Sequence, residues 1–584
     1  MSFRVTGDNQ VHYIPGAYGR ARVVTDRGLP NDPFQVGVMI GRQMHGVPYN
    51  ANGADGKGSE TLYQLAQSSA DIHALTGYDS VLSEAFEAAK VAPGNPLPRA
   101  YFIGISPTTK SSATIPDDAA GDSIDLISKD WGAATGDIQI TIVAGGAVNS
   151  IKITLTPPKD VAYLSADSGT DKVIEVNRIM PFMRAGATVY LTDNSTAAVS
   201  KVIESVDAAN KRITFTSAIS SGVTKANNAR IYLEDSDNAE TSGDLLTLDD
   251  VESFFAKSTL VAGTRSDGAT DIPDTIAKTA FKELTGATAG TSPEPQASDW
   301  TALMDMMDTI INEFAIETGF QMRVFYPVTP THSIHVAWAT YAATRRQAGM
   351  PISVVVGGDL SEVDFTADSA PTDPIDKLRA INSEDVQVCF GGLDSVAPYK
   401  SFAAQLFGIR CSNSVLHNQT RDQVKVATPE AYWQEGESNA ELLINAGATF
   451  LTVPTLNPRA GFVIAKGQNS LQSQNAGSTW NADGTTWLIR QRDLADISQR
   501  LTLQVLDAMT GSDGANGQGV TEAQARSAVV NVIDQLGPEG RGYVTDGQIQ
   551  SIVKDGEGWQ VAVNYTLPGE TNYFGVVFNL YPTA

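Results

Sequence analysis

The sequence is short of cysteine, of basic residues and of long apolar runs, and each shortage narrows the class of protein. Only Cys389 and Cys411 occur, without CxxC spacing, which indicates buried core thiols in a chain made in a reducing cytosol. Lys and Arg number 41 against 66 Asp and Glu, and the net charge of −25 argues against nucleic-acid binding and against attraction to anionic membranes. No run approaches the roughly 18 apolar residues of a membrane span, and Met1–Val5 shows no signal-peptide pattern.

Catalytic motifs are also missing from the sequence. It contains no Walker A loop, no GxSxG elbow and no HExxH pair. His332 and His335 are three residues apart, but the prolines at 327 and 330 favour an irregular or extended segment, and no third metal ligand is evident. We therefore predict no enzymatic activity, no metal and no cofactor.

At 584 residues the chain should hold roughly three or four domains. Strands are predicted at 34–40, 100–105, 352–356 and 386–390, and helices at 69–90, 300–316 and 341–349. Buried strands that alternate with helices indicate a mainly parallel α/β sheet. Between residues 106 and 250 short alternating runs replace the helical patterns, which predicts an inserted all-β domain that faces solvent.

The C-terminal region shows the sharpest pattern. A helix is predicted over 491–506, and Thr521 and Gln524 form a capping box for a second helix that ends at Gly537. Two strands are then predicted, 561–567 and 574–580, with a turn at Pro568-Gly569. A strand of this kind with an unpaired edge is a template for another chain, so we expect a neighbouring subunit to pair with it.

Several segments resemble contractile phage tail sheath proteins, particularly their Mu-like branch. These segments are Tyr13–Tyr18 (similar to "PGVY"), Val36–Gly41 followed by Gly46, Leu75–Leu82, Ala380–Val386, Asn445–Gly447 followed by Arg459–Gly461, and Trp487–Arg492, in which Gln491 interrupts the family's Arg-Arg step. Their shared order carries the resemblance, and the 106–250 segment has no counterpart in it.

The resemblance implies a multidomain fold of mixed α+β and α/β character. Its expected parts are an extended N-terminal arm (1–30), an α/β core (31–105 and 251–460), the outward-facing β-rich insert (106–250), a tube-proximal α/β domain (461–560) and a C-terminal strand arm (561–584).

The resemblance also implies a structural role without enzymatic activity. Subunits would stack as hexameric rings around a tail tube and contract to drive the tube through the host envelope, for ejection of the genome into the host. The implied partners are further copies of the chain, the tail tube protein, and baseplate and tail terminator proteins, in a virion tail assembled in the host cytoplasm, with no nucleic acid and no membrane insertion. No cofactor is implied.

Two groups of residues are expected to make these contacts. Strands of the two arms would add to sheets in neighbouring copies by β-augmentation, and Arg490, Arg492 and Arg500 are candidate contacts with an acidic tube, although ordinary solvated helix residues would look the same. The arm residues are Tyr13, Ile14, Tyr18, Val23, Val24, Val561, Val563, Tyr565, Phe574, Val576, Phe578 and Leu580.

Two alternatives remain open at this point. The first is a receptor- or glycan-binding virion protein that acts through the β-rich insert. The second is a hydrolase whose site has no recognisable motif.

Overall fold

The computed structural model describes most of the chain between residues 36 and 567. The described residues are 3–4, 11–12, 36–53, 58–77, 80–90, 100–105, 110–117, 121–132, 137–168, 171–193, 196–219, 222–225, 229–275, 282–283, 295–357, 374–390, 402–413, 415–424, 433–434, 440, 443–444, 446–453, 461–471, 488–507, 520–555 and 558–567.

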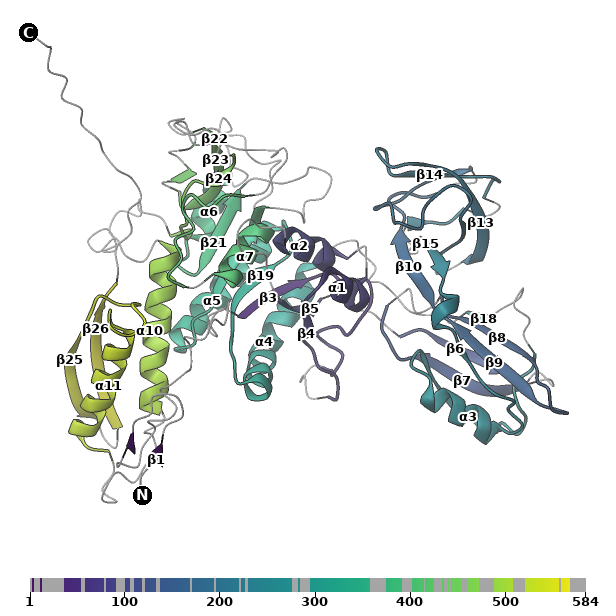
Figure 1. The fold of residues 1–584 in the computed structure, drawn as a ribbon, viewed down its shortest axis with the longest axis horizontal. Coiled ribbons are helices and arrows are strands. Elements are labelled where there is room, and N and C mark those ends of the chain that lie inside the picture. The colour runs from purple at the N-terminus through teal and green to yellow at the C-terminus, as the bar shows by residue number, and fades with distance from the viewer. Residues whose placement is uncertain are drawn as a thin grey trace, which may run out of the picture.

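A nine-stranded, mostly parallel sheet forms the central unit of the molecule (Figure 1). The strand order is β22-β23-β21-β20-β19-β3-β5-β4, with β24 paired to β23. Only β4 and β24 run antiparallel to their neighbours. The strands are β3 (Val36–Gly41), β4 (Gln64–Ala66), β5 (Ala100–Gly104), β19 (Met322–Pro327), β20 (Ser353–Gly357), β21 (Val386–Phe390), β22 (Trp433–Gln434), β23 (Ala448–Val453) and β24 (Val463–Ile464). The predicted parallel sheet is confirmed.

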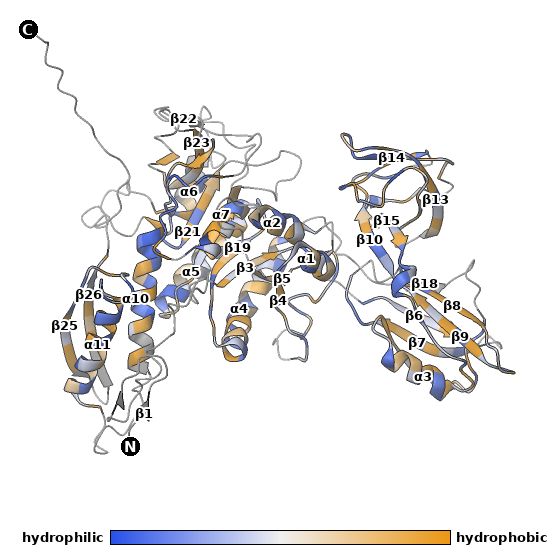
Figure 2. Ribbon diagram, viewed as in Figure 1, coloured by the Kyte–Doolittle hydropathy of each residue, from blue (hydrophilic) through white to orange (hydrophobic). Residues whose placement is uncertain are grey.

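Helices cover both faces of this sheet. Successive residues of β3 point to opposite sides, because Val38 and Ile40 belong to one apolar core and Met39 to the other. Figure 2 shows the apolar colouring of the sheet strands that results from burial on both faces. The helices over the first core are α4 (Ala297–Thr318), α5 (His332–Gln347) and α6 (Pro374–Ile381), and those over the second are α1 (Ser69–Thr76), α2 (Val81–Lys90) and α7 (Phe402–Ser412).

Two predictions about these helices were wrong. The single helix expected over 69–90 is two helices, because Gly77 adopts φ +93°, which an α-helix cannot contain. The segment at His332 and His335 is not extended but forms the start of α5. Pro327 and Pro330 both precede this helix, where a missing N–H disrupts no helical hydrogen bond.

A β-rich insert lies between β5 and α4 in the sequence and forms two lobes. The first lobe contains β6 (Ser112–Pro116), β7 (Asp122–Ser128), β8 (Gln139–Ala144), β9 (Ile151–Thr156), β16 (Glu240–Thr241), α3 (Leu248–Lys257), β17 (Val261–Arg265) and β18 (Lys282–Glu283). The second contains β10 (Pro158–Tyr163), β11 (Val173–Glu175), β12 (Thr188–Asp193), β13 (Thr196–Asp207), β14 (Arg212–Phe215) and β15 (Arg230–Glu234). Because β17 pairs with β7 and β18 with β8, hydrogen bonding within the insert continues past residue 250.

A buried ion pair joins the two lobes. Arg230 on β15 donates to both carboxylate oxygens of Asp137, at 2.6 and 2.7 Å. Burial raises the pKa of Asp137 above its usual value, and the close bidentate pairing with Arg230 offsets only part of that rise. The lobes otherwise have separate apolar cores.

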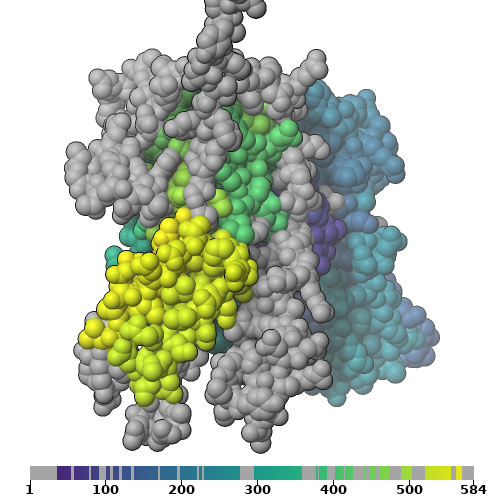
Figure 3. Space-filling model, turned by 60° about the vertical axis from the view of Figure 1, so that its left-hand side comes forward, coloured from purple at the N-terminus to yellow at the C-terminus, as the bar shows by residue number. Residues whose placement is uncertain are grey.

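The C-terminal unit consists of two helices and a two-stranded sheet. These elements are α10 (Ile489–Asp507), α11 (Glu522–Leu536), β25 (Asp546–Asp555) and β26 (Gly558–Thr566). The predicted capping box at Thr521 and Gln524 is confirmed. The C-terminal unit and the β-rich insert lie at opposite ends of the central unit, and Figure 3 shows the same separation from another side.

Near the N-terminus, a short ladder pairs β1 (Phe3–Arg4) with β2 (Val11–His12). The rest of the expected arm, including Tyr13, Ile14, Tyr18, Val23 and Val24, lies outside the described residues. Within the described part of the chain, no helix combines the length and apolarity that crossing a membrane requires.

Candidate assembly surface and its anchorage

The strand predicted over 561–567 is present as β26, and its alternation is as expected. Val561, Val563 and Tyr565 are partly buried, whereas the residues between them are exposed. The buried side faces helix α11, because Gly547 on β25 lies next to both Ile533 and Tyr565. The predicted strand at 574–580, with Phe574, Val576, Phe578 and Leu580, lies outside the described residues.

The hydrogen-bonding partner of β26 within the chain was not predicted. It is β25, which runs antiparallel to β26 from Asp546↔Thr566 to Asp555↔Gly558. A register shift between Ile549 and Ser551 interrupts the period-two pattern of β25 and moves Ile552 back to the partly buried side. The sequence signal of this strand is weak for that reason.

The β25–β26 sheet has two strands in the part of the chain that the structure describes. Each strand therefore has one edge that no other described strand pairs with. A two-stranded hairpin is only marginally stable alone, and this one is supported on one face by α11 and α10. The outer face carries Gln548, Gln550, Ala562, Asn564 and Thr566, all exposed and uncharged, and the exposed carboxylate of Asp546 at one end.

Helix α10 attaches this unit to the central unit through buried charges. Asp493 accepts from Arg410 on α7 at 2.8 and 2.9 Å and from Arg323 on β19 at 3.2 Å. Asp496, one turn further along, accepts from Arg323 at 3.2 Å and from Arg346 on α5 at 2.7 Å. Arg323 is fully buried, and the Asp496 side chain is 1% exposed.

A second layer of carboxylates extends this network. Arg346 also pairs with Asp385, just before β21, and with Glu384. Burial alone would raise the pKa of Asp496, but the guanidinium groups of Arg492, Arg323 and Arg346 outweigh it and hold that pKa below its usual value. Asp496 is therefore ionised in the folded protein at neutral pH, and its charge is shared by three arginines.

The three arginines predicted as tube contacts have different environments. Arg492 donates to Asp496 at 2.9 Å and to Glu384 at 2.8 Å, so its charge is engaged within the chain. Arg500 is 8% exposed, and burial, with the positive charges of Arg323 and Arg345, lowers its pKa to about 9. Arg490 is partly exposed and lines a small cavity. The role of these residues as tube contacts stays a prediction.

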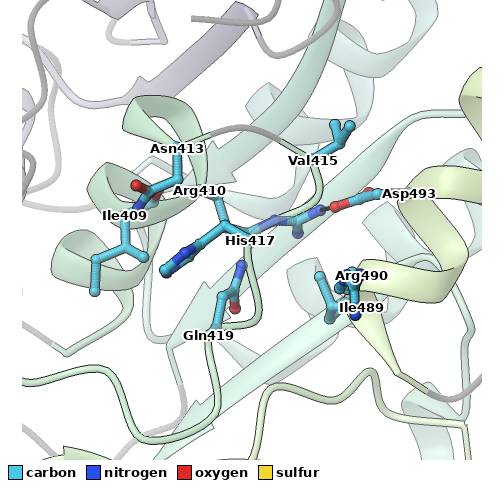
Figure 4. A pocket seen from close by; sticks show the side chains of 9 residues that line it. All are labelled: Ile409, Arg410, Asn413, Val415, His417, Gln419, Ile489, Arg490 and Asp493. Carbon is cyan, nitrogen blue, oxygen red and sulfur yellow. Dashed lines mark hydrogen bonds and ion pairs between the residues drawn. The ribbon is translucent and has the colours of Figure 1, made fainter. Parts of the chain in front are cut away.

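The cavity beside Arg490 lies between α7, the segment that follows α7, and α10 (Figure 4). Its volume is about 10 Å³, about the room that one water molecule needs. The Arg410 and Asp493 side chains meet at its wall. The lining residues are Ile409, Arg410, Asn413, Val415, His417, Gln419, Ile489, Arg490 and Asp493. It is too small for an organic ligand.

The histidine pair on α5 has a structural environment. His335 is buried, and its Nε2 donates to the carbonyl oxygen of Thr329 at 2.8 Å, which joins the start of α5 to the turn after β19. Among the described residues, no group of three or more His, Cys, Asp or Glu side chains is placed to hold a metal ion. Burial lowers the pKa of His335 to about 4.

This lowered pKa predicts acid sensitivity. The unfolded chain binds a proton at His335 below about pH 6.5, but the folded chain does so only near pH 4. Stability is therefore lost progressively as the pH falls through this window, by about 2–3 kcal/mol between pH 7 and pH 4.5 for this residue. Urea unfolding at both pH values should show a correspondingly smaller loss for His335→Gln than for the wild type. Equal losses in the two proteins would contradict the assignment.

No protein-family model and no curated protein matches the chain. Among solved structures, it is similar to the anti-feeding prophage (AFP) baseplate structure, with 12% identity, a TM-score of 0.36, and coverage of 49% of this chain and 75% of the other. It is also similar to the AFP helical sheath in its contracted state, with 13% identity, a TM-score of 0.35, and coverage of 49% and 76%. The second of these structures is described as a helical sheath, the kind of assembly whose proteins the sequence resembles.

Proposed function

We propose that the chain is the structural subunit of a contractile tail sheath, without enzymatic activity. Copies polymerise as stacked hexameric rings around a tail tube, and contraction drives the tube through the host envelope. The observation that carries the proposal is the β25–β26 sheet, whose outer edges pair with no other strand of the described chain. Such edges accept strands from neighbouring copies through backbone hydrogen bonds.

The arrangement of the units is consistent with a subunit that has one end facing the tube and the other facing outward. The C-terminal unit and the β-rich insert lie at opposite ends of the central unit. If the C-terminal unit faces the tube, the insert faces outward, where it does not obstruct the stacking of rings. Of the candidate tube contacts, Arg490 retains partial exposure, Arg492 is engaged by Asp496 and Glu384, and Arg500 is buried, so we propose Arg490 as the better candidate.

The remaining assignments follow from the same proposal. The partners are other copies of the chain, the tail tube protein, and baseplate and terminator proteins. The protein resides in the virion tail after assembly in the host cytoplasm. Contacts that pass from one copy to the next without closing generate a helical tube, and contraction is a rigid-body rearrangement of subunits.

Electron microscopy of the purified full-length chain tests the proposal. We expect long hollow tubes in negative stain without any added protein. Discrete monomers or trimers at every concentration would overturn it. If such particles also bound a glycan array, the receptor-binding alternative would take its place.

A further inference from the structure

Helix α10 belongs to two parts of the molecule at once. It is continuous over 19 residues, which corresponds to about 28 Å at 1.5 Å per residue. Asp493 and Asp496 in its first half lie in the charge network of the central unit, whereas Leu494, Ile497, Leu501 and Val505 along the helix contact the apolar core of the C-terminal unit. The two attachments differ in chemistry and share one rigid element.

The first attachment fixes the position of the helix along its axis. Asp493 and Asp496 are one turn apart and bind arginines from a strand and two helices, β19, α5 and α7. Removing either carboxylate from its partners would leave buried charges unpaired, which is strongly destabilising. A slide of α10 by one turn would do this to both residues. The network thus specifies a single register for α10.

The second attachment fixes the hairpin to the helix. Leu494 and Ile497 share an apolar core with Val532 and Leu536 of α11, and Leu501 and Val505 pack against it. Thr502 Oγ1 and the Tyr565 hydroxyl group on β26 form a hydrogen bond of 2.6 Å. The apolar side of α10, from Leu494 to Val505, is therefore bound to the unit that carries the open strand edges.

Few other elements connect these two parts. In the described chain, the extensive packing of α11, β25 and β26 is with one another and, for α11, with α10. Beyond α10, Val415 and Leu416 in the segment after α7 reach the core of the C-terminal unit. Helix α10 is the main mechanical connection.

We propose that α10 is a stiff coupling rod that transmits displacement of the β25–β26 hairpin to the nine-stranded sheet. A neighbouring copy that pulls on the hairpin edge would then rotate the central unit and the insert together with the hairpin. Without the rod, the same pull would only bend the chain between the two units. The use of this coupling in contraction rests on the proposed function. The coupling itself is a property of one chain and is tested without assembly.

Spin labels in the full-length chain measure the coupling directly. Ala343 on α5 and Ala562 on β26 are exposed, so Ala343→Cys and Ala562→Cys provide labelling sites on either side of α10. The native Cys389 and Cys411 are buried, and burial raises the pKa of both thiols, so the label selects the new sites. Unassembled, spin-diluted protein is used for pulsed dipolar measurements.

Gln499 is the place to interrupt the rod, because its side chain is exposed and it separates Leu501, Thr502 and Val505, which contact the C-terminal unit, from the charge network. Gln499→Pro removes the hydrogen bond to Ala495 and kinks the helix, whereas Gln499→Ala keeps it. We expect a single narrow distance distribution for Gln499→Ala and at least a twofold broader or shifted one for Gln499→Pro. Gln499→Gly, a milder change, should broaden it less and serves if the proline variant does not fold.

Two results would overturn the proposal. A folded Gln499→Pro chain with an unchanged narrow distribution would mean that contacts other than the continuous helix, such as those of Leu494 and Ile497, hold the C-terminal unit. A broad distribution in the Gln499→Ala control would mean that the unit moves freely even with the helix intact. Neither result depends on tube formation, so failure of the rod and failure of the sheath assignment are distinguishable.

Discussion

Replacement of Asp496 by asparagine is expected to lower the free energy of unfolding by about 3–5 kcal/mol, the usual cost of removing one partner from a buried ion pair. The isosteric change keeps the shape of the side chain and removes only its charge. Arg323, Arg346 and Arg492 would then share a neutral acceptor in a site closed to water. Because the free energy of unfolding of a whole domain is only roughly 5–15 kcal/mol, this single change should produce a large shift of the urea midpoint.

A matched control is available on the neighbouring helix. Glu522 and Arg526 form an exposed i,i+4 pair at 3.0 Å, and both side chains are about half exposed. Glu522→Gln makes the same chemical change in water, so the loss should stay below about 1 kcal/mol. Equal losses for Asp496→Asn and Glu522→Gln would contradict the role of burial. Near-neutral behaviour of Asp496→Asn would show that the network does not anchor α10.

The network also shows where prediction from sequence ends. The apolar stripe of α10, with Leu494, Ile497 and Leu501, was readable from its helical spacing and is confirmed. The i,i+4 spacing of Arg492 and Asp496 also indicates their pairing. The partners Arg323, Arg346 and Arg410 lie far away in sequence, on β19, α5 and α7. No local pattern assigns charged residues of a helix to a buried interface, because their usual place is the solvated face.

The strands likewise divide into those that local sequence patterns predict and those that they do not. Buried parallel strands such as β20 and β21 were predicted because continuous apolar runs need no partner to be recognised. Strand β25 was missed because its bulge breaks the alternation between Ile549 and Ile552. The break between α1 and α2 was missed because it depends on the positive φ angle of Gly77, which the sequence does not specify. The helical state of His332 was missed because Pro330 falls just before the helix start and not within the helix. The candidate assembly surface was predicted in part, since the sequence indicated β26 and its alternation but not the partner strand.

Removal of residues 568–584 should abolish tube formation and leave the described fold intact. The segment contains Phe574, Val576, Phe578 and Leu580 at alternate positions, the pattern of a strand with one buried face. We propose that this strand adds to the sheet edge of a neighbouring copy. About four backbone hydrogen bonds at roughly 1 kcal/mol each amount to about a thousandfold rise in the critical concentration for assembly.

Sedimentation and negative-stain microscopy across a concentration series measure this effect. The chain truncated after Leu567 should remain in the supernatant at concentrations where the wild type forms tubes. Its urea unfolding should be unchanged, because the described apolar cores are built from residues up to Leu567.

Point variants of the same segment give a second test. The double variant Phe574→Tyr and Phe578→Tyr keeps the alternation and the β propensity, so it should still assemble. Val576→Pro removes a backbone donor and should not assemble. Tubes from the truncated chain at the wild-type concentration would show that the copies are held together by other surfaces, and the open edges of β25 and β26 would then need a different occupant.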